Sequence, residues 1–140
     1  MNLSELAKSK TPGDLRQLAP NDYSLFWHSG FWDGPISGML KHTEKEYWFE
    51  MFQENENPAP GQWYRRYAVV ALTDEQLAKE HEVHEDFRRF VGTHSDYGKS
   101  DGKKESLKPK DQWHLFYDKH LEYCRSNRFG ECEVIAWFET

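Results

Sequence analysis

The chain has 140 residues and a formal net charge of −6, with 37% hydrophobic and 16% aromatic residues. This length suits one ordinary domain, and the aromatic share excludes a disordered chain because large rings bury much apolar area per residue. The acidic balance argues against nucleic acid and anionic membranes as partners, since phosphate binding needs a basic face.

Residues 1–21 are polar and contain two turns, so we expect an N-terminal arm with room for one short helix. Alternating aromatic and aliphatic residues then predict a first strand from Tyr23, with both of its faces largely covered. Three further strands are predicted at about 36–41, 47–52 and 63–72. Their short connections predict an antiparallel meander, because parallel neighbours need long crossovers.

The best-marked helix follows the fourth strand. Thr73 and Gln76 fit a capping box, Gly92 fits the position after the helix end, and apolar residues recur at the helical period. We therefore expect this capped helix to pack on one face of the sheet. The composition of residues 93–110 predicts a mobile loop.

A second helix is predicted from Pro109 or Asp111 to Arg125, and Val134–Phe138 reads as a buried last strand that joins the sheet. The sequence thus predicts an α+β fold in a single domain, residues 1–140. Its elements are a four-stranded antiparallel meander with a capped helix on one face, then a second helix and a C-terminal strand.

A histidine cluster on the first helix is the sharpest catalytic-looking segment. His81 and His84 stand three residues apart, and Glu85 or His94 could complete a site for a divalent transition metal such as zinc. The spacing is one residue shorter than the H-E-x-x-H motif of zinc proteases, so that resemblance fails. A small metal-dependent enzyme is therefore the alternative hypothesis, and solvated histidines with no cofactor are the preferred interpretation.

Two cysteines and two arginines are weaker candidates for a functional site than the histidine cluster. Cys124 could form a redox pair with Cys132 or a reactive thiol with His120, but no C-x-x-C spacing supports this, and two buried thiols are favoured. Arg65 and Arg66 lie among aromatics, as in single-stranded nucleic-acid platforms. On a strand they point to opposite faces, so ion pairing is the preferred interpretation and no nucleic acid is expected as a partner.

The surplus of aromatic residues points to a partner. Trp and Tyr are enriched at protein interfaces, and we expect the chain to carry more aromatic rings than one small core can bury. We therefore expect a non-catalytic protein-binding module, such as a small acidic inhibitor, an immunity-type protein or a regulatory adaptor. The partner is another protein or a second copy in a homodimer.

The N-terminus has no apolar run typical of a secretory signal, and no segment reaches the roughly 18–20 apolar residues of a membrane span. A cytoplasmic location and no membrane partner are therefore expected. The residues expected to contact the protein partner are Trp27, Phe31, Trp32, Trp48, Trp63 and Tyr64.

Overall fold

The fold is described from a computed structural model. It describes residues 1–31, 33–90 and 110–140, with the side chains of 30–31, 89–90 and 110–117 left aside. The chain divides into two compact units. The first comprises residues 1–73 and 127–140, and the second comprises residues 74–126. Each unit is described by itself.

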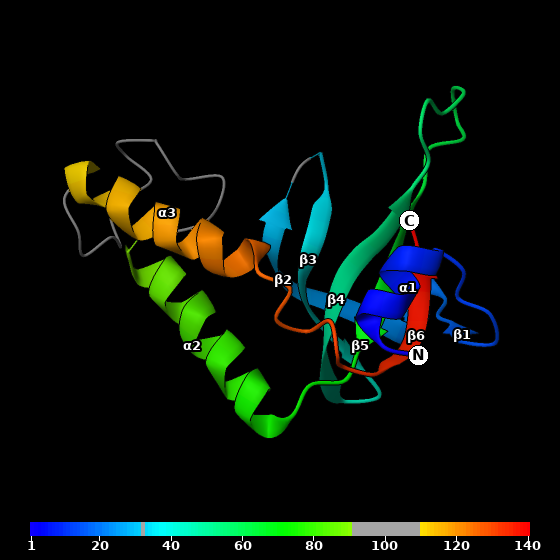
Figure 1. Ribbon diagram of the computed structural model, residues 1–140, viewed down its shortest axis with the longest axis horizontal. Helices are drawn as coiled ribbons and strands as arrows, with labels where there is room; N and C mark the ends of the chain where they lie inside the picture. Colours follow the sequence, from blue (N-terminus) through cyan, green and yellow to red (C-terminus); the bar gives the residue numbers. More distant parts are fainter. Residues whose placement is uncertain (32, 91–109) are drawn as a thin grey trace. The chain divides into compact units, whose positions relative to one another are not determined.

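A six-stranded sheet forms the first unit, in the order β1-β6-β5-β4-β3-β2 (Figure 1). The strands β2 to β5 follow one another as an antiparallel meander, and β6 joins antiparallel to β5. The predicted α+β class, meander and C-terminal strand are thus confirmed. The short strand β1, which pairs parallel with β6, was not predicted. The strands are β1 (Arg16–Gln17), β2 (Tyr23–Phe31), β3 (Pro35–His42), β4 (Lys45–Glu54), β5 (Arg65–Val70) and β6 (Val134–Glu139).

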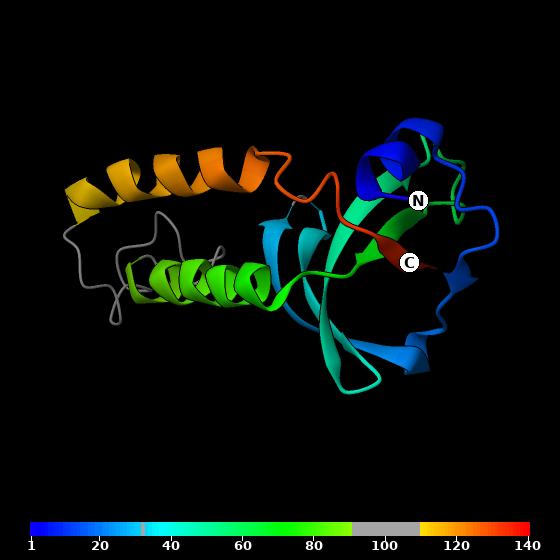
Figure 2. The same cartoon turned by 60° about the horizontal axis from the view of Figure 1, so that its bottom comes forward.

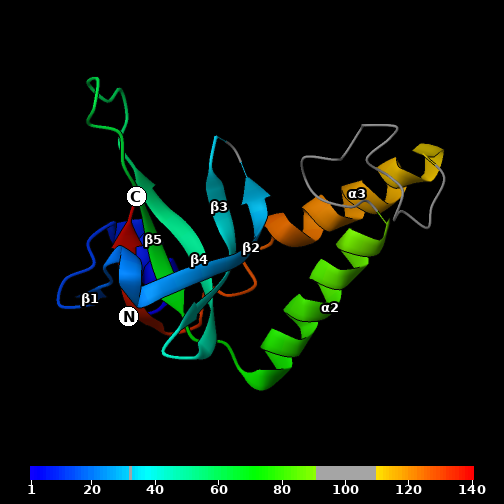
Figure 3. The same cartoon turned by 180° about the vertical axis from the view of Figure 1, so that it is seen from behind.

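The sheet curls strongly, and β2 bends along its length (Figure 3). The chain passes from β1 at one edge through the short 3-10 helix η1 (Pro20–Asp22) into β2 at the other edge. The His42 ring nitrogen Nδ1 lies 2.7 Å from the Asp22 carbonyl and helps to fix this passage. The inner face holds a core of apolar side chains: Leu18, Leu40, Phe49, Tyr67, Val69, Ala136 and Phe138.

The helix α1 (Leu3–Ser9) contacts β4 and β5 and lies on the side of the sheet opposite to the first half of β2 (Figure 2). Asn2 caps it by accepting the backbone N–H of Glu5 at 2.8 Å. Leu3 and Leu6 are buried. The predicted short helix of the N-terminal arm is therefore present, and two leucines one turn apart anchor it in the core.

The bulges in β2 overturn the predicted coverage of both its faces. Leu25 pairs with Leu40 and Trp27 pairs with Met39, which leaves Phe26 as an extra residue between them. Such a bulge breaks the period-two alternation of side chains. Leu25 and Phe26 are both exposed as a result.

The second unit contains α2 (Asp74–Phe90) and α3 (Lys110–Arg125), which contact each other. Both helices lie within one residue of their predicted limits. The packing of α2 on a face of the sheet stays a prediction. The expected loop at 93–110 falls almost wholly outside the described residues. Among the helices of the described chain, none is long and apolar enough to cross a membrane.

Candidate functional site

Exposed hydrophobic side chains gather on the edge strand β2. In the part of the chain that the structure describes, the large hydrophobic side chains that are exposed are Met1 (41%), Leu25 (42%), Phe26 (41%) and Trp63 (52%). Two of these are neighbours at the β2 bulge, and β2 is the last strand of the sheet order. We call Leu25, Phe26 and Lys41 the β2 edge patch.

The β2 edge patch combines apolar area with one positive charge. The Lys41 Nζ lies 4.6 Å from the centre of the Phe26 ring, a cation–π distance. Lys41 is on β3, where it pairs with Ser24 next to the bulge. The side chains of the patch are therefore held by two paired strands, while the ring itself stays accessible.

The predicted contact residues have different environments. Trp27 is half-buried on β2, Phe31 ends that strand, and Trp32 lies outside the described residues. Trp48 is only 1% exposed, and its ring meets the Phe129 ring edge-on at 5.1 Å. Trp48 is thus a core residue of the described structure, and this burial speaks against its predicted role as a contact residue.

The remaining two predicted contact residues lie where the loop after β4 enters β5. Trp63 is exposed, and Tyr64 is half-buried. The Arg65 guanidinium lies 5.8 Å from the Trp63 ring, and that of Arg66 lies 4.8 Å from the Tyr64 ring. These two aromatics form a second surface, separate in sequence from the β2 edge patch.

Arg65 and Arg66 point to opposite faces of β5, as predicted, and each pairs with a carboxylate. The Arg65 Nε donates to Glu54 at 2.8 Å, and its side chain is 5% exposed. The Arg66 Nε donates to Glu139 at 2.6 Å in a more accessible position. The expected ion pairing is confirmed, and the two cations do not form one basic patch.

Glu50 of β4 is a half-buried carboxyl group among aromatic and cationic neighbours. The Trp48 Nε1 donates to its Oε2 at 3.1 Å, and the Arg128 guanidinium lies 5.0 Å from the Trp48 ring. Burial raises the pKa of Glu50, and the Trp48 hydrogen bond and the Arg128 charge oppose that shift. Sequence reasoning missed this group because Arg128 is remote in sequence and only the fold brings it near.

The histidine cluster stays on one helix. His81 and Glu85 are exposed on α2, His84 is half-buried, and His94 lies outside the described residues. Among the described residues, no three His, Cys, Asp or Glu side chains are grouped so that they could hold a metal ion. His81, His84 and Glu85 alone therefore do not form a metal-binding group.

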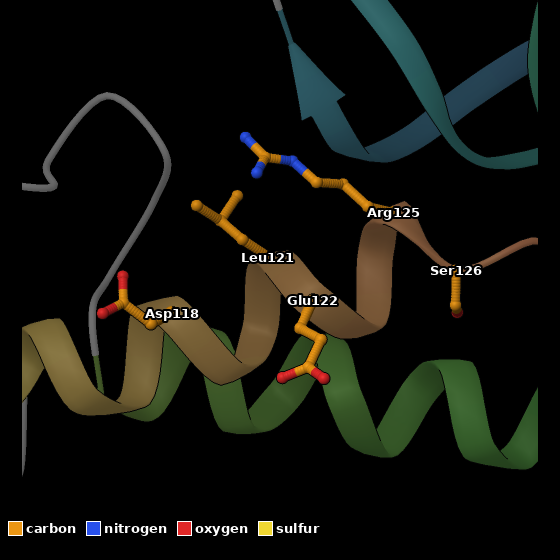
Figure 4. Close-up of a pocket in the computed structure, with 5 residues that line it drawn as sticks. All are labelled: Asp118, Leu121, Glu122, Arg125 and Ser126. Carbon is orange, nitrogen blue, oxygen red and sulfur yellow. The ribbon is translucent and has the colours of Figure 1, made fainter.

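A shallow pocket of about 460 Å³ lies along α3 within the second unit. Figure 4 shows four of its lining side chains on α3 and Ser126 just after the helix end, with Leu121 and Arg125 extending from the same side of the helix. The other lining residues are Asp118, Glu122 and Ser126. The pocket gathers two carboxylates and one guanidinium, an open mixed-charge surface without a described catalytic pair.

Comparison with known proteins gives no relative for this chain. No family model matches it, and neither the curated proteins nor the solved structures contain a significant match.

Proposed function

We propose that the chain is a non-catalytic protein-binding module that uses the β2 edge patch as its contact surface. The observation that carries this proposal is the adjacency of Leu25 and Phe26, both exposed at 42% and 41%, on an edge strand. Burying such side chains under a partner gains about 25 cal/mol per Å² of apolar area. Aromatic anchors of this kind supply much of the binding energy at protein interfaces.

The chemistry of the patch suggests what the partner presents. Phe26 and Leu25 would pack against apolar side chains of the partner. The Lys41 ammonium beside the Phe26 ring would pair with a carboxylate of the partner at the edge of the patch. The bulge at Phe26 interrupts the regular spacing of backbone groups along β2. Side-chain contact is therefore favoured over the addition of a strand to this edge.

Affinity capture from the native lysate tests this function. Three immobilised proteins are compared: the wild type, the Leu25→Ser and Phe26→Ser double variant, and Ala59→Ser, in the exposed loop after β4, as a control outside the predicted contact residues. We expect the wild type and the control to retain the same protein, and the double variant to lose it. Equal capture by all three folded proteins would refute the role of the β2 edge patch.

A further inference from the structure

The second unit holds a cysteine and a histidine in direct contact. The Cys124 Sγ lies 3.4 Å from the His120 Nε2, one turn away on α3. His120 is 8% exposed, and its ring lies 4.4 Å from the Phe87 ring of α2 at an angle of 38°. Contact between two helices therefore holds the imidazole beside the thiol.

This geometry suits the activation of a thiol. With a proton on Nδ1, the Nε2 of His120 can accept the proton of Cys124, and the resulting thiolate is the nucleophilic form of cysteine. Glu80 of α2 is 2% exposed, and its Oε1 accepts the Tyr123 hydroxyl at 2.6 Å. This hydrogen bond is a second, polar contact between α2 and α3.

We propose that Cys124 is a reactive thiol that forms a mixed disulfide with low-molecular-weight disulfides, with His120 as its base. The proton of Cys124 moves to His120, and the thiolate attacks one sulfur of the small disulfide. A new S–S bond forms at Cys124 as the S–S bond of the reagent breaks. The departing thiolate takes the proton from His120, so the Cys124 sulfur is oxidised and half of the reagent is reduced to a thiol.

Cys132 provides an internal control. Both cysteines are half-buried thiols, but Cys132 belongs to the first unit, where its backbone N–H donates to Phe129 and its carbonyl accepts from Leu3. Partial exposure alone would give the two thiols similar reactivity. A large difference in favour of Cys124 would point to the imidazole.

The test measures mixed-disulfide formation with hydroxyethyl disulfide near neutral pH, followed by intact-mass spectrometry. The chains are C132S, which reports Cys124 alone, C124S, which reports Cys132 alone, and H120Q/C132S. We expect C132S to react about threefold faster or more than the other two, since a larger thiolate fraction outweighs its weaker nucleophilicity. Y123F/C132S removes the hydroxyl bonded to Glu80 but keeps His120, so it should react nearly as fast as C132S.

Two results would overturn the proposal. One is a rate in H120Q/C132S that equals or exceeds the rate in C132S while far-ultraviolet circular dichroism stays unchanged. The other is equal rates for C132S and C124S. If H120Q/C132S does not fold, the comparison of C132S with C124S decides alone, because both keep the packing of His120.

Discussion

The Tyr23 ring at the start of β2 lies 4.3 Å from the Phe138 ring of β6, with an angle of 32° between their planes. The strands β3, β4 and β5 stand between β2 and β6 in the sheet order. The two rings can therefore meet only because the sheet curls and brings its distant strands together around the inner core.

This contact predicts a clear cost for removing the Tyr23 ring. Tyr23→Ala should lower the free energy of unfolding by about 2–3 kcal/mol, since it opens a cavity against the core. Tyr64→Ala, which removes a half-buried ring over Arg66, should cost about 1 kcal/mol or less. Urea unfolding measures both. Equal losses in the two variants would contradict the role of Tyr23 in closing the sheet.

The neighbouring arginines of β5 should differ in their contribution to stability. Arg65 is almost fully buried, bonds Glu54 and also donates to the Pro35 carbonyl at 3.4 Å. Arg65→Ala should therefore cost about 2–4 kcal/mol, because it leaves a partly buried carboxylate and a carbonyl with fewer partners. Arg66→Ala should cost about 1 kcal/mol or less, as expected for a more exposed ion pair. Thermal and urea unfolding of the two variants measure the difference, and the reverse order would be incompatible with the assigned burial.

Gly38 of β3 sits where the bulged strand β2 approaches most closely. A Cβ at this position would lie 2.1 Å from the Trp27 carbonyl oxygen and 2.6 Å from the His28 Cα. Both are backbone atoms, so Gly38→Ala should destabilise the protein by about 3 kcal/mol or more. Gly13→Ala meets no atom within 4 Å and serves as the control, with about 1 kcal/mol of strain from its positive φ. Similar unfolding midpoints for the two variants would show that β2 does not run as described.

The half-buried carboxyl of Glu50 predicts a pH dependence of the free energy of unfolding. Because the pKa of Glu50 is raised in the folded state, its protonated form stabilises the fold. That contribution is complete below the ordinary value of 4.5 and is lost as the pH rises through the folded-state pKa. The glutamine side chain of Glu50→Gln carries no proton that titrates in this range, so the free energy of unfolding of the variant relative to the wild type should increase as the pH rises.

Urea unfolding at a series of pH values measures this difference. Glu56→Gln, in the exposed loop after β4, is the matched control and should follow the wild type throughout. A flat difference between Glu50→Gln and the wild type would mean that Arg128 and Trp48 compensate fully for the burial of the carboxylate.

Local sequence signals predicted most of the fold. The turn residues at Gly34-Pro35 and the periodicity of 74–90 depend on neighbours in sequence, and the corresponding elements formed within a few residues of their expected limits. The parallel pairing of Arg16 with Ala136 could not be predicted this way, because it joins segments far apart in the chain and both residues of β1 are exposed.

The sequence predicted the candidate site less well than it predicted the fold. Alternation assigned Leu25 and Phe26 to covered faces, and only the pairing with β3 reveals the bulge that exposes both. Residue type alone predicts Trp48 as a contact residue, although Phe129, eighty-one residues later, packs against it. Residue type thus predicted an aromatic surface but not which rings form it.

Photo-crosslinking from position 26 tests the proposed function most directly. A benzoylphenylalanine replaces Phe26 in one protein and Ala59, in the exposed loop after β4, in a control protein. Both are irradiated in the cells from which the sequence comes. The β2 edge patch predicts a discrete adduct with a second protein from position 26 and none from position 59. No adduct from position 26, or the same adducts from both positions, would contradict it.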